Sequence, residues 1–496
     1  MILIKNVSFI IDKNLNVFEN KDILIEGKGP NATIKYGSNL VEKEGINKKD
    51  VEIIDGKGKC AMPGLTNTHV HLPMTLLRGV CDDKILQDWL NTIWSCESKL
   101  KPKDVYYGSL LGCLEMVRFG ITSFNDMYFF SDEIVKAVKK IGLKGVISYP
   151  IIDFGTPDCK DVDKLLRMAE RFISKNKNGN SENNSSENNI GNSNRGNNKI
   201  NSNIEINSIN RINNNYNNID NINNDNNNKN NGTNNYTDYK NNNYNIIPAI
   251  GPHAPYTCSE DTYKECKNIS DEYNTFLHTH ISETRYEVVE MENKINMRPV
   301  QYLQKIGVLD KNVIGAHLVW ITKEEVNILR KHNVKVSHCP VSNMKLASGG
   351  VMPIVEMINN NVDISIGTDG PASNNNYDIL EDLKICSLLH KSHRWDPTVM
   401  NVDTLLKMAF NSEMIGFKNN DIVILDINLP HIQPINAHNI KSHIIYSFNG
   451  SDVDTVIVSG NILLKNKKFN FEDKFIYNIY DKINNINKKF YNLGEN

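Results

Sequence analysis

Residues 246–370 contain the clearest repeating unit of the sequence, a set of short apolar runs that each end in polar residues: IIPAIGPHAP (246–255), TFLHTH (275–280), VIGAH (313–317), VKVSHCP (334–340) and DISIGTDG (363–370). Apolar runs of this length are typical of buried strands, and helical patterns separate them. The same alternation begins earlier, where the run GVISYPII (145–152) precedes a helical pattern at residues 162–173. Repeated strand–helix units predict an α/β fold, a (β/α)8 barrel of TIM type, whose C-terminal strand edges form one shared site.

The two ends of the chain carry a different pattern of short alternating strands, for example DIVILDI (421–427) and DTVIVSGNILL (454–464). Such alternation is typical of strands with one buried face. We therefore predict that residues 1–60 and 419–496 pair as one small β-sandwich-like domain, and that the barrel occupies residues 61–418. Apolar residues near the C-terminus recur at helical spacing and predict a terminal amphipathic helix: Phe475, Ile479, Ile483, Ile486 and Phe490.

A long Asn-rich segment at residues 176–245 interrupts the predicted barrel. Its composition, mostly Asn with Ser, Gly, Lys and spaced Ile, offers too little apolar surface to offset the entropy that a folded chain loses. We expect a disordered insertion with no recognition motif of its own.

Charge and composition favour a small-molecule partner. Lys and Arg total 56 against 58 for Asp and Glu, a formal net charge of −2, so we expect neither nucleic acid nor an anionic membrane as a partner. The segment at residues 1–17 is interrupted by charged residues, so we expect a strand there and neither a signal peptide nor a membrane span. The nine Cys contain no Cys-x-x-Cys pair, which predicts reduced thiols and a cytoplasmic location.

The segment CAMPGLTNTHVHLP (60–73) places His69 and His71 two residues apart on the first predicted barrel strand. Alternate residues of a strand project from the same face, so both imidazoles can meet one metal ion. A lone His-x-His is a weak signal, but its position after Pro-Gly at a strand end strengthens the metal hypothesis.

Three further strand ends supply groups of the same kind. The segment LHTHISET provides His280 as a ligand and Glu283 as a carboxylate free for proton transfer, while His278 has the same strand parity and competes with His280. His317 and Asp369 end two later strands. Each could alone be a structural polar group, but their recurrence at successive strand ends favours a metal centre.

Together these residues offer three imidazole nitrogens and one carboxylate oxygen for a divalent ion, with room for a water molecule: His69, His71, His280 (or His278) and Asp369. Such an ion lowers the pKa of its water, and Asp369 with His317 can accept the proton that the water releases. Glu283 can protonate the atom next to the attacked carbon. The sequence thus predicts a hydrolytic enzyme.

Seven motifs in barrel order carry a resemblance to a known family: PGLTNTHVH, LQDWLNTIWSCES, GPHAPYTCS, HTHISET, GAHLVW, SHCPVSNMKLASG and IGTDGPASNN. The sequence resembles the amidohydrolase superfamily, and more narrowly its methylthioadenosine/S-adenosylhomocysteine deaminase and 5′-deoxyadenosine deaminase group. Triazine hydrolases and guanine deaminases share part of the pattern.

The resemblance implies particular roles. It selects His280 over His278, which gives the ligand set of His69, His71, His280 and Asp369. It also implies one divalent ion, with zinc expected and Fe²⁺ compatible with the same ligands. The catalytic residues are then Glu283, His317 and Asp369. A homo-oligomer is also expected.

In a deaminase of this group, the water attacks the amino-bearing purine carbon, and ammonia leaves an inosine-type product. The substrate would contact both Glu283 and Asp369. The resemblance further implies that Glu97 holds the ribose hydroxyls, that His253 contacts the nucleoside and that Trp89 shapes an apolar wall. Without the resemblance, Trp89 and Glu97 are better explained as an ordinary packing residue and a solvated helix position.

Two departures from the family pattern bear on substrate and activity. The segment GVISYPIIDFG (145–155) has no Arg to clamp the carboxylate of S-adenosylhomocysteine, which favours 5′-deoxyadenosine and 5′-methylthioadenosine over that compound or adenosine. Arg167 and Arg171 on the next helix are the alternative cations. The connection at residues 411–426 is also shorter than the family usually has.

Two alternatives stay open. One is another amidohydrolase that acts on guanine, a pterin or an aminotriazine, against which Glu97 argues because it suits a ribose. The other is a catalytically silent, metal-stabilised scaffold, which the insertion and the shortened connection suggest and the retained Glu283 opposes.

Overall fold

A computed structural model describes residues 1–177 and 245–491. The predicted insertion at residues 176–245 therefore lies outside the described residues, apart from its edges. At the first edge, helix α5 (Val162–Lys177) continues to Lys177.

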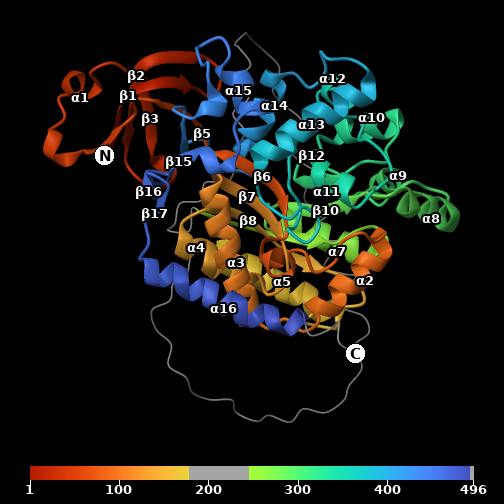
Figure 1. Cartoon of the computed structure of the whole chain (residues 1–496). Helices are drawn as coiled ribbons and strands as arrows, with labels where there is room; N and C mark the ends of the chain where they lie inside the picture. Colours follow the sequence, from red (N-terminus) through yellow and green to blue (C-terminus); the bar gives the residue numbers. More distant parts are fainter. Residues whose placement is uncertain (178–244, 492–496) are drawn as a thin grey trace, which may run out of the picture. The chain divides into compact units, whose positions relative to one another are not determined.

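Eight parallel strands form one sheet in chain order (Figure 1). These barrel strands are β6 (Leu65–Val70), β7 (Ile121–Met127), β8 (Lys144–Ile151), β9 (Ile246–Pro252), β10 (Leu277–Ile281), β11 (Val313–His317), β12 (Lys335–His338) and β13 (Asp363–Ile366). Seven of the eight are buried along their whole length, as expected for parallel strands with helices outside and packed side chains inside. The predicted α/β barrel is confirmed.

The first and last barrel strands are joined through side chains. Asn67 Nδ2 donates to Thr368 Oγ1 at 2.7 Å, and the Thr368 backbone N–H donates to Asn67 Oδ1 at 3.0 Å. Thr68 Oγ1 also donates to the Ile366 carbonyl at 2.9 Å. These bonds hold the C-terminal ends of β6 and β13 together, where two of the predicted ligands lie.

Helices follow the barrel strands: α2 (Leu86–Glu97), α3 (Pro102–Arg118), α4 (Ser131–Ile141), α5, α7 (Glu260–Glu272), α8 (Arg285–Ile295), α9 (Pro299–Lys305), α10 (Lys323–His332), α11 (Pro340–Lys345), α12 (Ile354–Asn359), α13 (Ile379–Arg394) and α14 (Val402–Ala409). Side-chain caps fix where several begin. Ser259 accepts the Thr262 N–H at the start of α7, and Asp378 accepts two N–H groups at the start of α13. Such caps satisfy backbone donors that have no partner within the helix.

Both ends of the chain meet in a second, mixed sheet in the order β17-β16-β15-β14-β5-β1-β2-β3, with β4 paired to β1. Its strands are β1 (Ile2–Ile11), β2 (Val17–Glu26), β3 (Thr33–Gly37), β4 (Glu52–Asp55), β5 (Lys59–Pro63), β14 (Ile422–Asp426), β15 (Val453–Val458), β16 (Asn461–Lys465) and β17 (Lys468–Phe469). The antiparallel pair of β5 and β14 joins the two ends, with Met62 opposite Val423. The N- and C-terminal segments thus share one small β-structure, as predicted.

The connection after α14 is short but well packed. Residues 412–415 form the 3-10 helix η4, and Met414, Ile415 and Phe417 are buried. They form one apolar cluster with residues near the start of the barrel strands, among them Val146 and Ile247. Because the strand ends that carry the predicted site lie at the opposite edge, the shortening removes no site residue.

Two α-helices lie among the described residues of the C-terminal segment. The predicted terminal helix is α16 (Asp473–Tyr491), which lies against α3 (Figure 1). Lys489 on α16 pairs with Asp104 on α3 at 3.0 Å. Helix α15 (Ile440–Tyr446) packs on α13 and α14 and was not predicted from the sequence.

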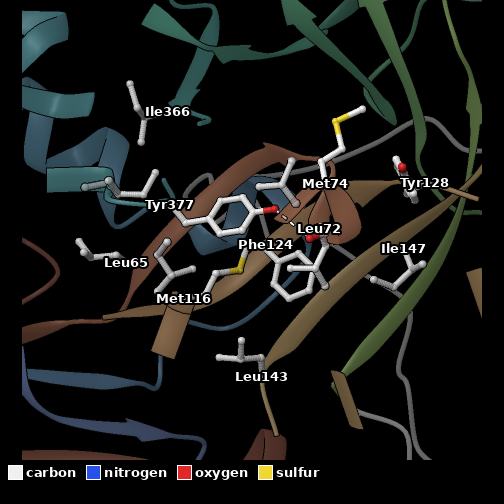
Figure 2. Packing of buried hydrophobic residues seen from close by; sticks show 14 of the residues in the cluster. Leu65, Leu72, Met74, Met116, Phe124, Tyr128, Leu143, Ile147, Ile366 and Tyr377 are labelled. Carbon is white, nitrogen blue, oxygen red and sulfur yellow. Dashed lines mark hydrogen bonds between the residues drawn. The ribbon is translucent and has the colours of Figure 1, made fainter. Parts of the chain in front are cut away.

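The core beside β6 is built around a fully buried tyrosine (Figure 2). The Tyr377 hydroxyl lies 3.1 Å from the carbonyl oxygens of both His71 and Leu72 and donates to them. Phe124 and Met116 pack in the same apolar cluster. This contact fixes the backbone at the C-terminal end of the first barrel strand.

The cysteines and the apolar character of the helices complete the description of the fold. All nine Cys are buried and free. Among the helices of the described residues, none combines the length and apolar character that a membrane crossing requires.

A buried ion pair links the barrel to the small sheet and predicts a large stability effect. Lys144 Nζ at the start of β8 lies 2.8 Å from Asp421 Oδ1, and both side chains are almost inaccessible. The change Asp421→Ala leaves a buried ammonium without its partner, so the free energy of unfolding should fall by about 3–5 kcal/mol. Denaturant titration followed by circular dichroism measures this change.

The matched control is Lys136→Ala, which breaks the exposed pair with Glu133. That change should cost less than about 1 kcal/mol. Equal shifts for the two variants would contradict the structural role of the Lys144–Asp421 pair.

Candidate metal centre and substrate pocket

Histidines and a carboxylate from distant parts of the chain meet at the C-terminal edge of the barrel. His71 Nε2 lies 3.2 Å from Asp369 Oδ1, and His69 Nε2 lies 3.4 Å from the same oxygen. His280 Nε2 lies 3.4 Å from His71 Nε2. Ligand bonds of about 2.0–2.1 Å in a tetrahedral site place neighbouring donor atoms about 3.3 Å apart, so this spacing fits one divalent ion.

The ring orientations of two histidines also fit a metal centre. His71 Nδ1 donates to the Met127 carbonyl at 2.7 Å, and His280 Nδ1 donates to the His253 carbonyl at 2.8 Å. Since a carbonyl can only accept, each Nδ1 carries the proton and each Nε2 presents a lone pair to the cluster. Metal-binding histidines are commonly oriented by such bonds.

His278 and His280, which strand parity could not separate, occupy different positions. His280 lines a pocket at this edge of the barrel, together with His71 and Asp369. His278 lies behind His69, with its Nε2 2.9 Å from His69 Nδ1. His69 Nε2 is buried and makes no hydrogen bond among the described residues. A buried nitrogen without a partner is costly unless a ligand binds it, which supports the fit of a cation.

Asp369 is held so that one oxygen faces the histidines. Its Oδ2 accepts from Ser342 Oγ at 2.7 Å and from Ser373 Oγ at 2.9 Å. Burial opposes ionisation, but the neighbouring His69 and His71 hold the pKa of Asp369 well below its ordinary value. Burial lowers the pKa of His69 to about 4. Neutral imidazoles beside an ionised carboxylate form the donor set that a divalent cation requires.

His317 differs from the other histidines in its hydrogen bonds. The Asn343 side-chain nitrogen donates to His317 Nδ1 at 3.0 Å, so the proton of the ring lies on Nε2. That Nε2 points toward Glu283, 3.8 Å from its Oε2. His317 and Asp369 both have positive φ angles, +74° and +64°, which non-glycine residues rarely adopt and which often mark functional sites.

Glu283 is buried beside the cluster, and its backbone is fixed from the following helix. The carboxylate of Glu287 accepts the N–H groups of Ser282 and Glu283 at 2.9 and 2.8 Å. Thr284 caps the start of α8. Burial raises the pKa of Glu283 to about 8, so the carboxyl retains a proton near neutral pH and can act as a proton donor.

The remaining predicted site residues line the same pocket. Trp89 and Glu97 come from α2, and His253 follows β9, with its Nδ1 2.9 Å from Thr257 Oγ1. Glu97 is buried next to Tyr128, and burial raises its pKa to about 8. Glu97 is therefore not on the solvated helix face that composition alone suggested.

Several residues of the site had no role in the sequence analysis. Ser342 and Asn343, which orient Asp369 and His317, lie inside the motif SHCPVSNMKLASG, so the motif was the available signal. The apolar walls of the pocket include Trp94, Tyr256 and Leu346, which also lie inside quoted motifs, and Ile152 in the segment GVISYPIIDFG. Only Tyr128 and Phe129 lie outside every segment that the sequence analysis singled out.

The two arginines considered for carboxylate binding lie elsewhere. Neither Arg167 nor Arg171 lines the pocket, and Arg167 lies in a separate surface depression beside Asp153. A wider outer chamber adjoins the pocket and shares Trp94 and Tyr256 with it. Arg285 lines that chamber, with its guanidinium carbon 5.9 Å from the centre of the Trp320 ring.

Comparisons with known proteins agree with this architecture. The model of the Amidohydrolase family matches residues 60–463. The 5′-deoxyadenosine deaminase of Methanocaldococcus jannaschii is 38% identical over 94% of this chain and 94% of that protein. The 5-methylthioadenosine/S-adenosylhomocysteine deaminase of Thermococcus kodakarensis is 38% identical over 93% of this chain and 94% of its own length.

A solved structure shows the same fold over the whole chain. An adenosine deaminase from Xanthomonas campestris, crystallised with bound zinc, superimposes with a TM-score of 0.81. The two sequences are 24% identical, and the match covers 99% of each chain.

The buried carboxyl of Glu97 predicts a pH-dependent stability difference. Its pKa rises from 4.5 to about 8 on folding, so the folded protein binds this proton more tightly than the unfolded chain. The stabilisation is complete below pH 4.5 and is lost as the pH rises toward 8, by about 1.4 kcal/mol per pH unit. Relative to Glu97→Gln, the wild-type protein should therefore lose stability over this window.

Denaturant titrations at several pH values between 5 and 9 measure the difference. Glu19→Gln, at an exposed position, controls for the loss of one surface carboxyl. A constant offset between wild type and Glu97→Gln across this range would contradict the burial effect.

Proposed function

Because this chain belongs to the amidohydrolase family, as its motifs predicted, we propose that it hydrolytically deaminates an adenosine-type nucleoside. The products are ammonia and the inosine-type nucleoside, and 5′-deoxyadenosine and 5′-methylthioadenosine are the favoured substrates. One observation carries the proposal: a cluster of His and Asp side chains lies beside the buried Glu283, which is not one of the proposed metal ligands, in one pocket. The deaminase names of two relatives that match over most of the chain support it.

The proposed cofactor is one divalent ion held by His69, His71, His280 and Asp369. The unpartnered Nε2 of His69 and the donor spacings near 3.3 Å support this set. Zinc suits three imidazoles and one carboxylate, and Fe²⁺ would fit the same donors. Strand β9 contains no Lys that could bridge two ions, so one ion is proposed. When bound, the cation supplies Lewis acidity that activates water as a nucleophile near neutral pH.

Asp369 and His317 divide the work around the attacking water. Asp369 is ionised and accepts the proton that the water gives up as it attacks the amino-bearing carbon. His317 has its proton on Nε2 in the observed hydrogen-bonding pattern, so it donates a hydrogen bond toward the developing charge. This assignment is narrower than the shared base role that the sequence predicted.

Glu283 is the proposed general acid. Its raised pKa keeps a proton on the carboxyl near neutral pH, and that proton passes to the ring nitrogen next to the attacked carbon. Protonation of the nitrogen makes the carbon more electrophilic. The ionised Glu283 then takes the proton of the added hydroxyl and passes it to the amino group, which departs as ammonia as the carbonyl forms.

The rest of the pocket suits a nucleoside with a small 5′ group. Glu97 accepts hydrogen bonds from the ribose hydroxyls, His253 contacts the nucleoside and Trp89 contributes to the apolar wall. Neither Arg167 nor Arg171 reaches the pocket, which supports uncharged 5′ groups. S-Adenosylhomocysteine is a poorer substrate in the proposal because no Arg or Lys of the described residues lines the pocket itself. Arg285, in the outer chamber, is the cation that its carboxylate would meet. Homo-oligomer formation and a cytoplasmic location stay predictions.

The alternatives fit less well. A guanine, pterin or aminotriazine substrate has no ribose to occupy the buried carboxyl of Glu97. A silent scaffold has no need of a buried glutamate beside the cluster whose backbone N–H is held by Glu287. The shortened connection at residues 411–426 packs against the barrel away from the pocket.

A substrate panel tests the proposal directly. The zinc-loaded protein is incubated with 5′-deoxyadenosine, 5′-methylthioadenosine, S-adenosylhomocysteine, adenosine and guanine, and ultraviolet absorbance and ammonia are followed. The first two compounds should turn over fastest, and guanine should not react. Glu283→Gln should lower kcat by about 10²–10⁴-fold, because general acid–base catalysis contributes about that much.

Metal content is measured in every sample. Glu283→Gln should keep the metal content of the wild type, because Glu283 is not a ligand, and Glu292→Gln on the exposed face of α8 is the matched control. Full metal content without any deamination would establish the scaffold reading. Turnover of guanine alone would establish the other alternative.

A further inference from the structure

A second group of metal-binding side chains lies outside the pocket, between β12 and α13. His338 on β12 and the pair Cys386 and His390 on α13 have one donor atom each, all within 4.8 Å of one another. All three side chains are buried. None of them lines the substrate pocket or the outer chamber.

The fold places this cluster on the outer side of the barrel wall. The side chain of His338 faces helix α13, because its Nε2 lies 3.1 Å from His390 Nε2. The preceding Ser337 contacts another barrel strand, with its Oγ 2.6 Å from Thr68 Oγ1 on β6. His338 is the next residue of the strand, so its side chain projects from the opposite face. Cys386 and His390 are four residues apart and therefore share one face of α13. Two rigid elements thus hold three donors.

Hydrogen bonds among the described residues leave several polar atoms of this cluster without a partner. His338 Nε2 and His390 Nε2 lie 3.1 Å apart, so they can share only one proton between them. The Nδ1 atoms of both rings are buried and make no hydrogen bond among the described residues. A buried histidine pair held in this way satisfies few of its polar atoms, which is costly in an apolar region.

The donors and nearby charge suit zinc. A thiolate and two imidazoles are donors that zinc prefers, and the two imidazole nitrogens, 3.1 Å apart, lie close to the donor spacing of a tetrahedral site. Asp382 lies one turn before Cys386 on the same face of α13 and is buried, with one unpartnered oxygen. Burial raises the pKa of both Cys386 and Asp382. A divalent ion beside them would favour their ionised forms, and the two negative charges would cancel the charge of the ion.

We propose that His338, Cys386 and His390 form a second, structural zinc site that ties strand β12 to helix α13. The site would stabilise the segment just after β12, which contains Ser342 and Asn343, the residues that orient Asp369 and His317. None of its three donors lines the pocket, so metal binding at this site can be measured separately from the proposed deaminase reaction.

Cobalt substitution tests the site, because among the candidate metal clusters of the described residues only this one contains a cysteine, which would bind the ion as a thiolate. The protein is loaded with Co²⁺ in place of zinc, and a thiolate-to-cobalt charge-transfer band in the near ultraviolet is sought. Wild type should show the band and bind one more equivalent of metal than Cys386→Ser, which should lack the band. Cys266→Ser, at another buried Cys on a barrel helix, is the matched control and should keep both.

The outcomes separate this site from the pocket. Cys386→Ser should retain deamination of 5′-deoxyadenosine, so loss of the band with unchanged activity supports a structural site. If the serine variant does not fold, Cys386→Ala provides the same comparison without a buried hydroxyl. A wild-type protein that lacks the band, or a Cys386 variant with unchanged metal content, would overturn the proposal. Failure of the deaminase assay would leave the band unaffected, so the two proposals fail separately.

Discussion

Three imidazole nitrogens and one carboxylate oxygen face one another at the C-terminal edge of the barrel, and the rest of the site depends on this constraint. Three pairs of these donor atoms lie 3.2 to 3.4 Å apart, and the buried Nε2 of His69 has no hydrogen-bonding partner among the described residues. Such an arrangement costs free energy in an apolar interior unless a cation compensates it. The parallel barrel makes it possible, because the strand ends that carry these side chains all meet at one edge.

Hydrogen bonds from outside the cluster decide what each histidine can do. Backbone carbonyls hold the Nδ1 protons of His71 and His280, which turns both Nε2 lone pairs inward. Asn343 does the reverse for His317 and leaves a proton on its Nε2. In our proposal, His71 and His280 are therefore metal ligands, whereas His317 is a hydrogen-bond donor. The difference arises from the groups that contact each ring and not from the position of the histidine on its strand.

Periodicity predicted the alternation of strands and helices, the pairing of the two chain ends and the shared edge, because hydrophobic spacing reports which faces are buried. It could not separate His278 from His280, since residues two apart share a strand face, and only the resemblance favoured one of them. Local pattern was misleading for Glu97: its helix position was predicted to be solvated, but tertiary packing buries the side chain. Ser342 and Asn343 act through contacts with residues distant in the chain, which local patterns do not encode, and helix α15 is short and was missed for lack of a clear period.

Anomalous diffraction at the zinc absorption edge, from crystals of the zinc-loaded protein, tests the central claim most directly. The account predicts a peak in the pocket about 2.0–2.2 Å from the Nε2 atoms of His69, His71 and His280 and from a carboxylate oxygen of Asp369. An active, zinc-loaded protein with no peak among these four side chains would contradict it.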